Sequence, residues 1–392
     1  MSKNRMIVAG VMSGTSADGI DVALVQIAKT RGGVADQTVR LLGHASYPYP
    51  SDVRREVLAS MNATSAAVAD LARLNSLLGE LYADAVLATQ RRFRVKAELI
   101  GCHGQTLYHQ GDLQKFLSRK ISTTWQTGEG AVIAAHVGVP VVSDFRPADM
   151  AAGGKGAPLV PYLDYLWFRD AHVGRIVQNI GGIANLTAIP AGAREEDIVA
   201  FDTGPGNMVI DAVMQELLGR TFDRDGKIAA SGEVIEPLVT KILGRKFFRT
   251  KPPKTAGREE FGREFVAEFL RMSRRARAKD VVATATALTS RSIADAVRHC
   301  VVGKAQDRSA FQEIILSGGG ARNATLVGML AEQLAPLGIV VRFSDELGLP
   351  SGAKEAVAFA VLAYETWHRR PSNVPSATGA RRPAVLGKIS YA

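Results

Sequence analysis

The chain has 392 residues, which is too long for one ordinary hydrophobic core and predicts two domains. With 46% hydrophobic and 22% charged residues, it has the composition of a soluble globular protein, and no apolar run reaches membrane-spanning length, so no membrane partner is expected. Of the net charge of +10, a net surplus of eight lies between Lys241 and Asp280. The basic run 274–279 in this segment lacks interleaved aromatic residues, so a solvated helix face is favoured over a nucleic-acid surface.

Two further features point to a reducing compartment. The two cysteines, Cys102 and Cys300, lie far apart in sequence and are expected to be packed thiols. No signal-peptide core follows the first six residues. We therefore expect a cytoplasmic protein.

In the first half, an apolar strand at 7–12, a glycine turn and a second apolar run at 20–27 predict a hairpin. Helical periodicity follows at 51–61 and 65–94, where a leucine stripe marks the buried face. A short strand at 99–102 is expected to end at His103, and a helix at 129–136 precedes a strand at 139–143. Residues 144–158 read as a loop between two domains, which we place at 1–150 and 151–392.

The second half is predicted to open on another hairpin, at 175–189. A strand at 198–201 ends at Asp202, and several helices occupy 233–302. Strands at 313–316 and 339–343 alternate with helices at 325–334 and 354–368. This alternation favours an α/β fold, and a glycine-turn hairpin at the start of each half suggests two related halves that face a cleft.

Three glycine-rich turns, each placed where an apolar run ends, favour a nucleotide site. Their candidate nucleotide-binding residues are Gly14, Thr15, Ser16, Ala17, Asp18 and Gly19 in the first turn, Gly181 and Gly182 in the second, and Gly318, Gly319, Gly320 and Asn323 in the third. Glycine permits sharp turns and close approach of the backbone, whose N–H groups can cradle phosphate oxygens. One such turn is weak support, but three suggest a nucleotide held between two halves, as in sugar kinases and actin-like ATPases.

Asp202 is the strongest catalytic candidate. A carboxylate at the end of a strand, before the tight turn Gly204-Pro205-Gly206-Asn207, can act as a general base, while N–H groups of the turn and of the helix that follows can bind an anion. The alternative is that Asp202 only caps the turn.

Other polar residues at predicted strand ends are candidates for substrate contacts. They are His103, Gln105, Thr106, Asp144, Arg146 and Lys155. For His103 considered alone, a hydrogen-bonded structural role is favoured. For the segment around Arg146 the alternative is an ion pair within the loop, although the dense glycines at 153–156 favour substrate or phosphate contact.

Several nucleotide and metal classes are disfavoured. No GxxxxGK[ST] signature is present, the first glycine turn leads into a strand where a dinucleotide fold needs a helix, and no His and Cys cluster suggests zinc. Asp18 and Asp21 near a phosphate loop suggest Mg²⁺, with Asx turns as the alternative. The direct metal ligands stay undetermined.

Taken together, the motifs resemble the anhydro-N-acetylmuramic acid kinases of bacterial cell-wall recycling. The resemblance spans nearly the whole chain and rests on segments 10–21, 101–106, 144–146, 156–161, 179–185, 202–207, 251–254, 257–259, 317–323 and 373–380. One departure is Glu129, where the family commonly has Asp in its Gln-x-Gly-Asp segment.

The resemblance implies two actin/hexokinase-like (ribonuclease H-like) domains flanking a nucleotide and substrate cleft, and a homodimer. It implies that ATP, with Mg²⁺, and water convert 1,6-anhydro-N-acetylmuramic acid to N-acetylmuramic acid 6-phosphate. It also implies that Asp202 is the base for the water, and that Gly14 through Ile20 and Asp21 bind ATP.

Two other functions are weighed against this one. A glycosidase acting without ATP would use paired acids such as Asp144 and Asp202, but it leaves the glycine turns unexplained. A non-catalytic actin-like ATP-binding protein explains the turns, but not the polar motifs at the strand ends.

Overall fold

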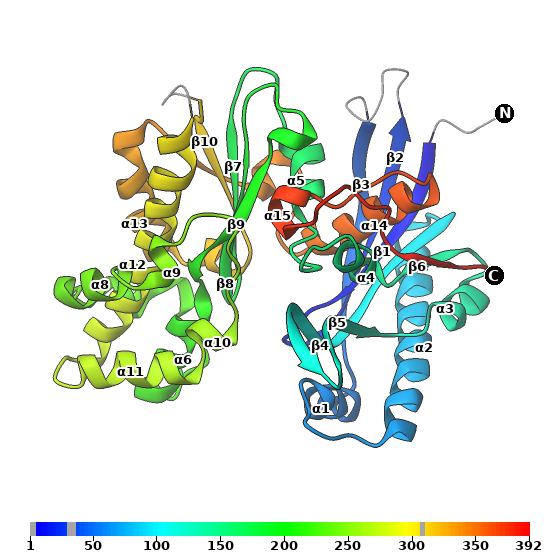
Figure 1. Ribbon diagram of the computed structural model, residues 1–392, viewed down its shortest axis with the longest axis horizontal. Coiled ribbons are helices and arrows are strands. Elements are labelled where there is room, and N and C mark those ends of the chain that lie inside the picture. The colour runs from blue at the N-terminus through cyan, green and yellow to red at the C-terminus, as the bar shows by residue number, and fades with distance from the viewer. Residues whose placement is uncertain (1–4, 30–36, 306–309) are drawn as a thin grey trace. The chain divides into compact units, whose positions relative to one another are not determined.

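The computed structural model describes residues 5–29, 37–305 and 310–392 (Figure 1). The chain forms two compact units. The first combines the residues up to 167 with residues 352–392, and the second is the continuous segment 168–351.

The first unit is built on a seven-stranded sheet with the order β12-β6-β4-β1-β2-β3, and β5 pairs with β4 beside this path. Its strands are β1 (Arg5–Ser13), β2 (Gly19–Lys29), β3 (Gln37–Pro48), β4 (Leu99–Phe116), β5 (Arg119–Thr127), β6 (Val141–Ser143) and β12 (Lys388–Ser390). β1, β2 and β3 form an antiparallel meander, to which β4 and β6 add in parallel. The hairpin predicted around the first glycine turn is therefore confirmed.

Helices cover both faces of this sheet. They are α1 (Ser51–Ser60), α2 (Val68–Phe93), α3 (Gly130–Val137), α4 (Phe145–Ala151), α5 (Pro161–Phe168), α14 (Lys354–Trp367) and α15 (Pro375–Thr378). Successive side chains of a strand point to opposite faces. Ala9 and Val11 of β1 accordingly pack in the core that contains Leu78 of α2, whereas Gly10 between them faces α14.

The domain boundaries expected from the sequence are wrong in two respects, because the C-terminal segment belongs to the first unit. A Cβ at Gly10 would lie 1.8 Å from the Ala356 carbonyl oxygen, and one at Gly101 would lie 2.1 Å from that of Phe359, so α14 packs directly on the backbones of β1 and β4. β12 pairs with β6. The first unit also continues to residue 167, well beyond the expected boundary at 150.

The second unit has a five-stranded sheet with the order β11-β10-β7-β8-β9. Its strands are β7 (Arg175–Ile180), β8 (Ile183–Ile189), β9 (Val199–Pro205), β10 (Glu313–Ser317) and β11 (Val340–Phe343). β7, β8 and β9 are antiparallel, and β10 and β11 add in parallel on the other side of β7.

The two sheets therefore share one topology, an antiparallel meander of three strands followed by two parallel strands. This repeat confirms the expected α/β fold of two related, ribonuclease H-like halves. In each sheet the carboxyl ends of the parallel strands lie at the same end of the sheet. Ligands bind at this end in open α/β sheets.

The helices of the second unit include one central, buried helix. They are α6 (Asn207–Leu218), α7 (Lys227–Ala230), α8 (Glu236–Leu243), α9 (Lys246–Arg249), α10 (Arg258–Phe261), α11 (Arg263–Ser273), α12 (Ala278–Ala296) and α13 (Ala324–Leu334). α12 is buried on nearly all sides, as its many Ala, Val and Thr residues permit. Its Thr289 hydroxyl donates to the Gly206 carbonyl oxygen at 3.1 Å, so this helix supports the turn that follows β9.

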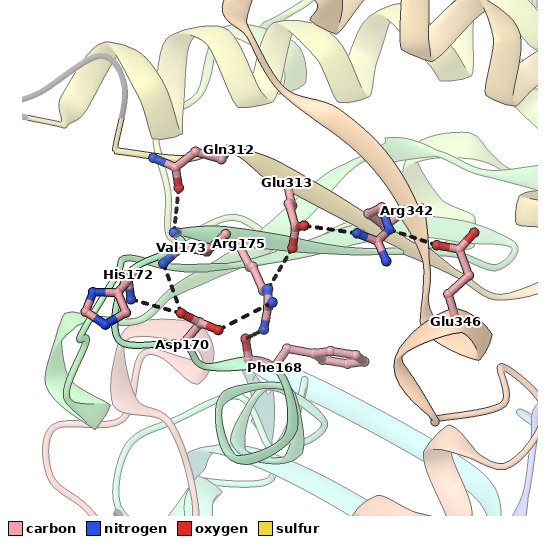
Figure 2. A network of polar contacts seen from close by, with 10 residues as sticks. Phe168, Asp170, His172, Val173, Arg175, Gln312, Glu313, Arg342 and Glu346 are labelled. Carbon is pink, nitrogen blue, oxygen red and sulfur yellow. Dashed lines mark hydrogen bonds and ion pairs between the residues drawn. The ribbon is translucent and has the colours of Figure 1, made fainter.

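An ion-pair network joins the parallel strands of the second unit near their amino ends (Figure 2). Glu313 of β10 accepts from Arg175 Nε of β7 at 2.8 Å and from Arg342 Nη1 of β11 at 3.3 Å. Arg175 also contacts Asp170 at 3.5 Å, and Arg342 donates to Glu346 at 2.8 Å. The network thus connects three neighbouring strands at the end of the sheet opposite to its glycine turns.

Three sequence expectations about local structure are wrong. β4 continues through His103 and Thr106 to Phe116, because Gly104 at φ +77° forms an irregularity that keeps the strand paired with β1 and β5. Asp202 lies inside β9, paired with Asn185, and not at the strand's end. The segment expected to be a loop after Asp144 begins with the helix α4.

None of the helices in the described part of the chain combines the length and hydropathy of a membrane-spanning segment.

Asp149 of α4 is fully buried and joins this helix to the loop that follows it and to the C-terminal segment. Its Oδ2 accepts from the Gly156 N–H at 2.8 Å, and its Oδ1 accepts from Asn373 Nδ2 and from Thr378 Oγ1, each at 2.7 Å. The carboxylate therefore holds the glycine-rich loop 153–156 and the C-terminal segment on one helix.

We predict that Asp149→Ala strongly destabilises the protein. The change leaves three buried donors unpaired, each costing about 1–3 kcal/mol, so the free energy of unfolding should fall by at least about 3 kcal/mol in urea titrations. Asn373→Ala removes one of the donors to Asp149 and the acceptor of the Ala384 N–H, at 2.7 Å, but leaves Asp149 its other two donors, so it should cost less. A loss for Asp149→Ala no larger than that for Asn373→Ala would contradict the role assigned to Asp149.

Candidate functional site

In the first unit, the turn between β1 and β2 lies at the carboxyl end of β1. The Gly14 carbonyl oxygen accepts from the Ala17 N–H and from Gln105 Nε2, both at 3.1 Å. A Cβ at Gly14 would meet only Ser16 Oγ, at 3.8 Å, so the space above this residue is open. The turn is thus fixed from β4, while its backbone stays accessible to a ligand.

The two carboxylates of this segment have protein partners. Asp18 lies 3.3 Å from Arg54 Nη2, and both side chains are largely exposed. Asp21 accepts from Ser46 Oγ and lies 3.3 Å from His44 Nε2, so β3 holds it. Across residues 5–29, 37–305 and 310–392, no group of three or more His, Cys, Asp or Glu side chains is placed to hold a metal ion.

His103 and Arg146 form a buried pair. Since Arg146 Nε can only donate, His103 Nε2 is the acceptor of their 3.0 Å hydrogen bond, and His103 Nδ1–H donates to the Gly104 carbonyl oxygen at 2.7 Å. Burial, and secondly the charge of Arg146, lower the pKa of His103 well below its usual range. The ring is therefore neutral, and both its nitrogens have partners in the protein, so His103 positions Arg146.

Arg146 stays charged in this buried environment. Burial lowers its pKa to about 10, against the opposing influence of Glu355 and Asp149. Its Nη1 donates to the Gly156 carbonyl oxygen at 2.7 Å. The guanidinium is thus held at the carboxyl end of β6.

Among the other predicted substrate residues, Gln105 and Thr106 lie close to this pair and Lys155 is more exposed. Gln105 is buried and reaches Gly14, as described above, and Thr106 Oγ1 accepts from Gln126 Nε2 at 3.2 Å. Lys155 Nζ forms an ion pair with Asp112 Oδ1 at 3.0 Å.

A pocket with room for about 160 Å³ opens beside residues 102–104 of β4 and the carboxyl end of β6. Two predicted residues, His103 and Asp144, line it. The lining also includes residues that the sequence analysis did not place in a site, notably Asn75 of α2 and Trp125 and Gln126 of β5. No sequence signal connects α2 with β5, because only the fold brings them together. Burial raises the pKa of Cys102, which lies beneath the pocket, to about 12, so it is a packed thiol, as expected.

In the second unit, the segment after α9 holds Asp202. Its Oδ2 accepts from the Ala256 N–H at 2.7 Å, and its own N–H donates to the Lys254 carbonyl oxygen at 3.1 Å. The Lys254 ammonium is buried, 4.6 Å from the centre of the Phe247 ring and 5.8 Å from that of Phe201. Burial lowers the pKa of Lys254, whereas Cys300 and Asp202 oppose this shift.

The expectation that backbone N–H groups after Asp202 bind an anion is wrong for three of them. The N–H groups of Gly206, Asn207 and Met208 donate to the carbonyl oxygens of Gly181 and Gly182, at 2.7–3.1 Å. These bonds fasten the start of α6 to the second glycine turn. Gly204, at φ +156°, packs against Ser292 of α12, so it shapes this turn.

The third glycine turn contains structural and accessible positions. A Cβ would lie 2.7 Å from the Ile180 carbonyl oxygen at Gly318 and 2.2 Å from Ile180 Cγ2 at Gly320, whereas at Gly319 the nearest atom is Asn207 Nδ2, at 3.3 Å. Asn323 Oδ1 accepts from the Leu326 N–H at 3.0 Å and caps α13. Gly319 is thus the glycine of this turn best suited to a ligand.

The fold and its strand-end residues define a two-domain α/β protein with glycine turns at the carboxyl ends of its strands, a class suited to binding phosphorylated ligands. The sequence model described as anhydro-N-acetylmuramic acid kinase matches residues 6–392. The chain belongs to the anhydro-N-acetylmuramic acid kinase family, and the resemblance noted from its motifs is confirmed.

Relatives in this family cover nearly the entire chain. The anhydro-N-acetylmuramic acid kinase of Bacillus cereus (strain Q1) is 43% identical over 389 residues, which are 98% of this chain and 99% of the relative. The anhydro-N-acetylmuramic acid kinase of Bacillus thuringiensis subsp. konkukian (strain 97-27) is 42% identical over 389 residues, again 98% of this chain and 99% of the relative. Among solved structures, the Acidaminococcus fermentans (R)-2-hydroxyglutaryl-CoA dehydratase component A covers 92% of this chain and 98% of its own, at 12% identity and a TM-score of 0.44, too low to support a conclusion.

We predict that His103 makes stability depend on pH. Because its pKa is lowered in the folded state, the unfolded chain binds the proton more readily, so stability is lost as the pH falls below about 6.5. His103→Gln keeps an acceptor for Arg146 but cannot titrate. Urea unfolding between about pH 7.5 and about pH 5.5 should show a smaller loss for the variant, by up to about 1.4 kcal/mol per pH unit. Equal losses in both proteins would contradict a buried neutral His103.

Proposed function

We propose that the protein is an ATP-dependent kinase that opens 1,6-anhydro-N-acetylmuramic acid with water and phosphorylates it to N-acetylmuramic acid 6-phosphate. This reaction recycles peptidoglycan in the cytoplasm, and the enzyme acts as a homodimer. The observation that carries the proposal is membership of the kinase family over residues 6–392.

Asp202 is the proposed general base. The N–H of Ala256 fixes the orientation of its carboxylate, and β9 and α12 hold the adjoining turn, so the base is part of a rigid structure. Asp202 takes a proton from a water whose oxygen bonds to the anomeric carbon as the bond from that carbon to O6 breaks. The released O6 attacks the γ-phosphorus, and the bond to the ADP oxygen breaks.

This sequence needs no second carboxylic acid. In a glycosidase an acid protonates the departing oxygen. Here the departing oxygen instead accepts the γ-phosphoryl group. Phosphoryl transfer depends mainly on positioning and charge stabilisation.

The glycine turns are the proposed ATP site. The backbone at Gly14, Gly181, Gly182 and Gly319 has room for a ligand, since a Cβ at any of them would stay at least 3.3 Å from other atoms. Mg²⁺ would neutralise phosphate charge. The described residues contain no cluster that would hold the ion alone, which fits an ion bound largely by phosphates and water, with Asp18 and Asp21 as nearby carboxylates.

The sugar is proposed to contact the polar residues of the first unit that the sequence analysis selected as substrate contacts. Arg146 and Lys155 supply positive charge, and Gln105, Thr106 and Asp144 supply hydrogen-bonding groups. His103 acts through Arg146.

The direct test is to incubate the purified protein with ATP, Mg²⁺ and the anhydro sugar in ¹⁸O-water and to analyse the products by mass spectrometry. The proposal requires a sugar phosphate whose label is at the anomeric hydroxyl in the first product formed. Sugar opened without ATP would indicate a glycosidase. Label in the phosphate, or rapid ATP hydrolysis without sugar, would indicate an ordinary ATPase.

We predict that Asp202→Asn lowers turnover by about 10²–10⁴-fold while ATP affinity is unchanged, because the base is lost and the turns are intact. Asp197→Asn, which changes an exposed carboxylate ahead of β9, is the matched control and should keep normal turnover. Near-normal activity of Asp202→Asn would move the base assignment to Asp144.

We also predict that Gly14→Leu and Gly319→Leu weaken ATP binding by about tenfold or more and affect sugar binding less, because a side chain blocks the approach of phosphate to the backbone. Gly328→Leu, at an open position of α13, is the control. Calorimetric titration measures each affinity. Unchanged ATP affinity in both variants would exclude these turns as the nucleotide site.

A further inference from the structure

The pocket beside residues 102–104 of β4 and the carboxyl end of β6 has an unusual charge for the site of an anionic substrate. Glu129 and Asp144 line it, whereas no Lys or Arg does. His103, also in the lining, is neutral, as shown above. Asp144 lies 3.7 Å from the exposed Lys388, which does not line the pocket. An anionic group is therefore disfavoured in this pocket, and a group that donates hydrogen bonds is favoured.

Gln126 adds an unused acceptor. Its side chain is only 8% exposed, and its Nε2 donates to Thr124 Oγ1 at 2.8 Å and to Thr106 Oγ1 at 3.2 Å. Its buried Oε1 has no hydrogen-bond partner among the described residues. Such an acceptor costs about 1–3 kcal/mol. A small rotation of the amide would present it to a donor in the pocket.

Trp125 supplies an apolar wall. It lines the pocket and is 44% exposed, although a large aromatic side chain gains most by burial. Its cross-strand partner Tyr108 is equally exposed but does not line the pocket. An indole face beside convergent polar groups is a common arrangement in sites for small polar molecules.

We propose that this pocket receives the uncharged side of the amino sugar, with the acetamido N–H donating to Gln126 Oε1 and the ring lying against Trp125, and that the lactyl carboxylate stays outside it. The inference rests on the proposed function and adds Gln126 and Trp125 as residues that determine specificity.

The test compares two sugars and three variants by calorimetry. The sugars are 1,6-anhydro-N-acetylmuramic acid and 1,6-anhydro-N-acetylglucosamine, which lacks the lactyl group. Gln126→Met should weaken the binding of both sugars by the same factor, about 5- to 150-fold for one buried hydrogen bond. Trp125→Ala should also weaken the binding of both sugars equally, and neither variant should change ATP affinity. Tyr108→Ala, the matched control on the same hairpin, should bind both sugars normally. Sugar binding should also change the tryptophan fluorescence of the wild type, and this change should be absent in Trp125→Phe.

Two results would overturn the inference. Losses confined to the sugar with the lactyl group would place the carboxylate in the pocket. Normal sugar affinity of both Trp125→Ala and a folded Gln126→Met would show that the pocket does not bind the sugar. If Gln126→Met does not fold, the sugar affinity of Trp125→Ala, a change at an exposed position, is the deciding measurement. The proposed function fails separately, when the wild type phosphorylates no anhydro sugar.

Discussion

Two buried charges on one turn of α4 determine how the first unit is organised around its site. Arg146 and Asp149 lie three residues apart, and neither can be buried without partners. The protein supplies them from β4 through His103, from the glycine-rich loop through Gly156, and from the C-terminal segment through Asn373 and Thr378. Satisfying these two charges fixes three segments that are far apart in sequence, and the same contacts aim the guanidinium.

The ion-pair network and the glycine turns occupy opposite ends of the second sheet. The ion pairs of Glu313 with Arg175 and Arg342 join the strands near their amino ends. The glycine turns lie at the carboxyl ends of the strands. Some of their glycines pack against neighbouring backbone, and others have free space above them. Tight packing at Gly318 and Gly320 holds such a turn in place and leaves Gly319 accessible.

Periodicity in the sequence predicted much of the fold, because local patterns determined those elements. Both glycine-turn hairpins and the alternation from β10 to α14 lie close to their predicted bounds. Sequence patterns were insufficient where contacts between distant segments determine which residues are buried and which segments are helical. Of the leucine stripe on α2, only Leu74 and Leu78 are buried, because packing with the sheet selects a narrower face. α4 looked like a loop because its charged residues have their partners elsewhere in the chain. The candidate site residues could be chosen from motifs, but the occupied N–H groups after Asp202 and the places of Trp125 and Gln126 in the pocket lining depend on contacts between strands.

The discontinuity of the first unit has a consequence for biosynthesis. The ribosome makes residues 5–167 first, yet α14, β12 and the partners of Asp149 in the C-terminal segment are made last. The second unit, encoded as one uninterrupted stretch, has all its strands before synthesis ends. Domains generally fold as units during translation. The second unit can therefore complete its fold before the first, although the first unit begins earlier in the sequence. Until residues 352–392 are made, the face of the first sheet that α14 covers stays exposed.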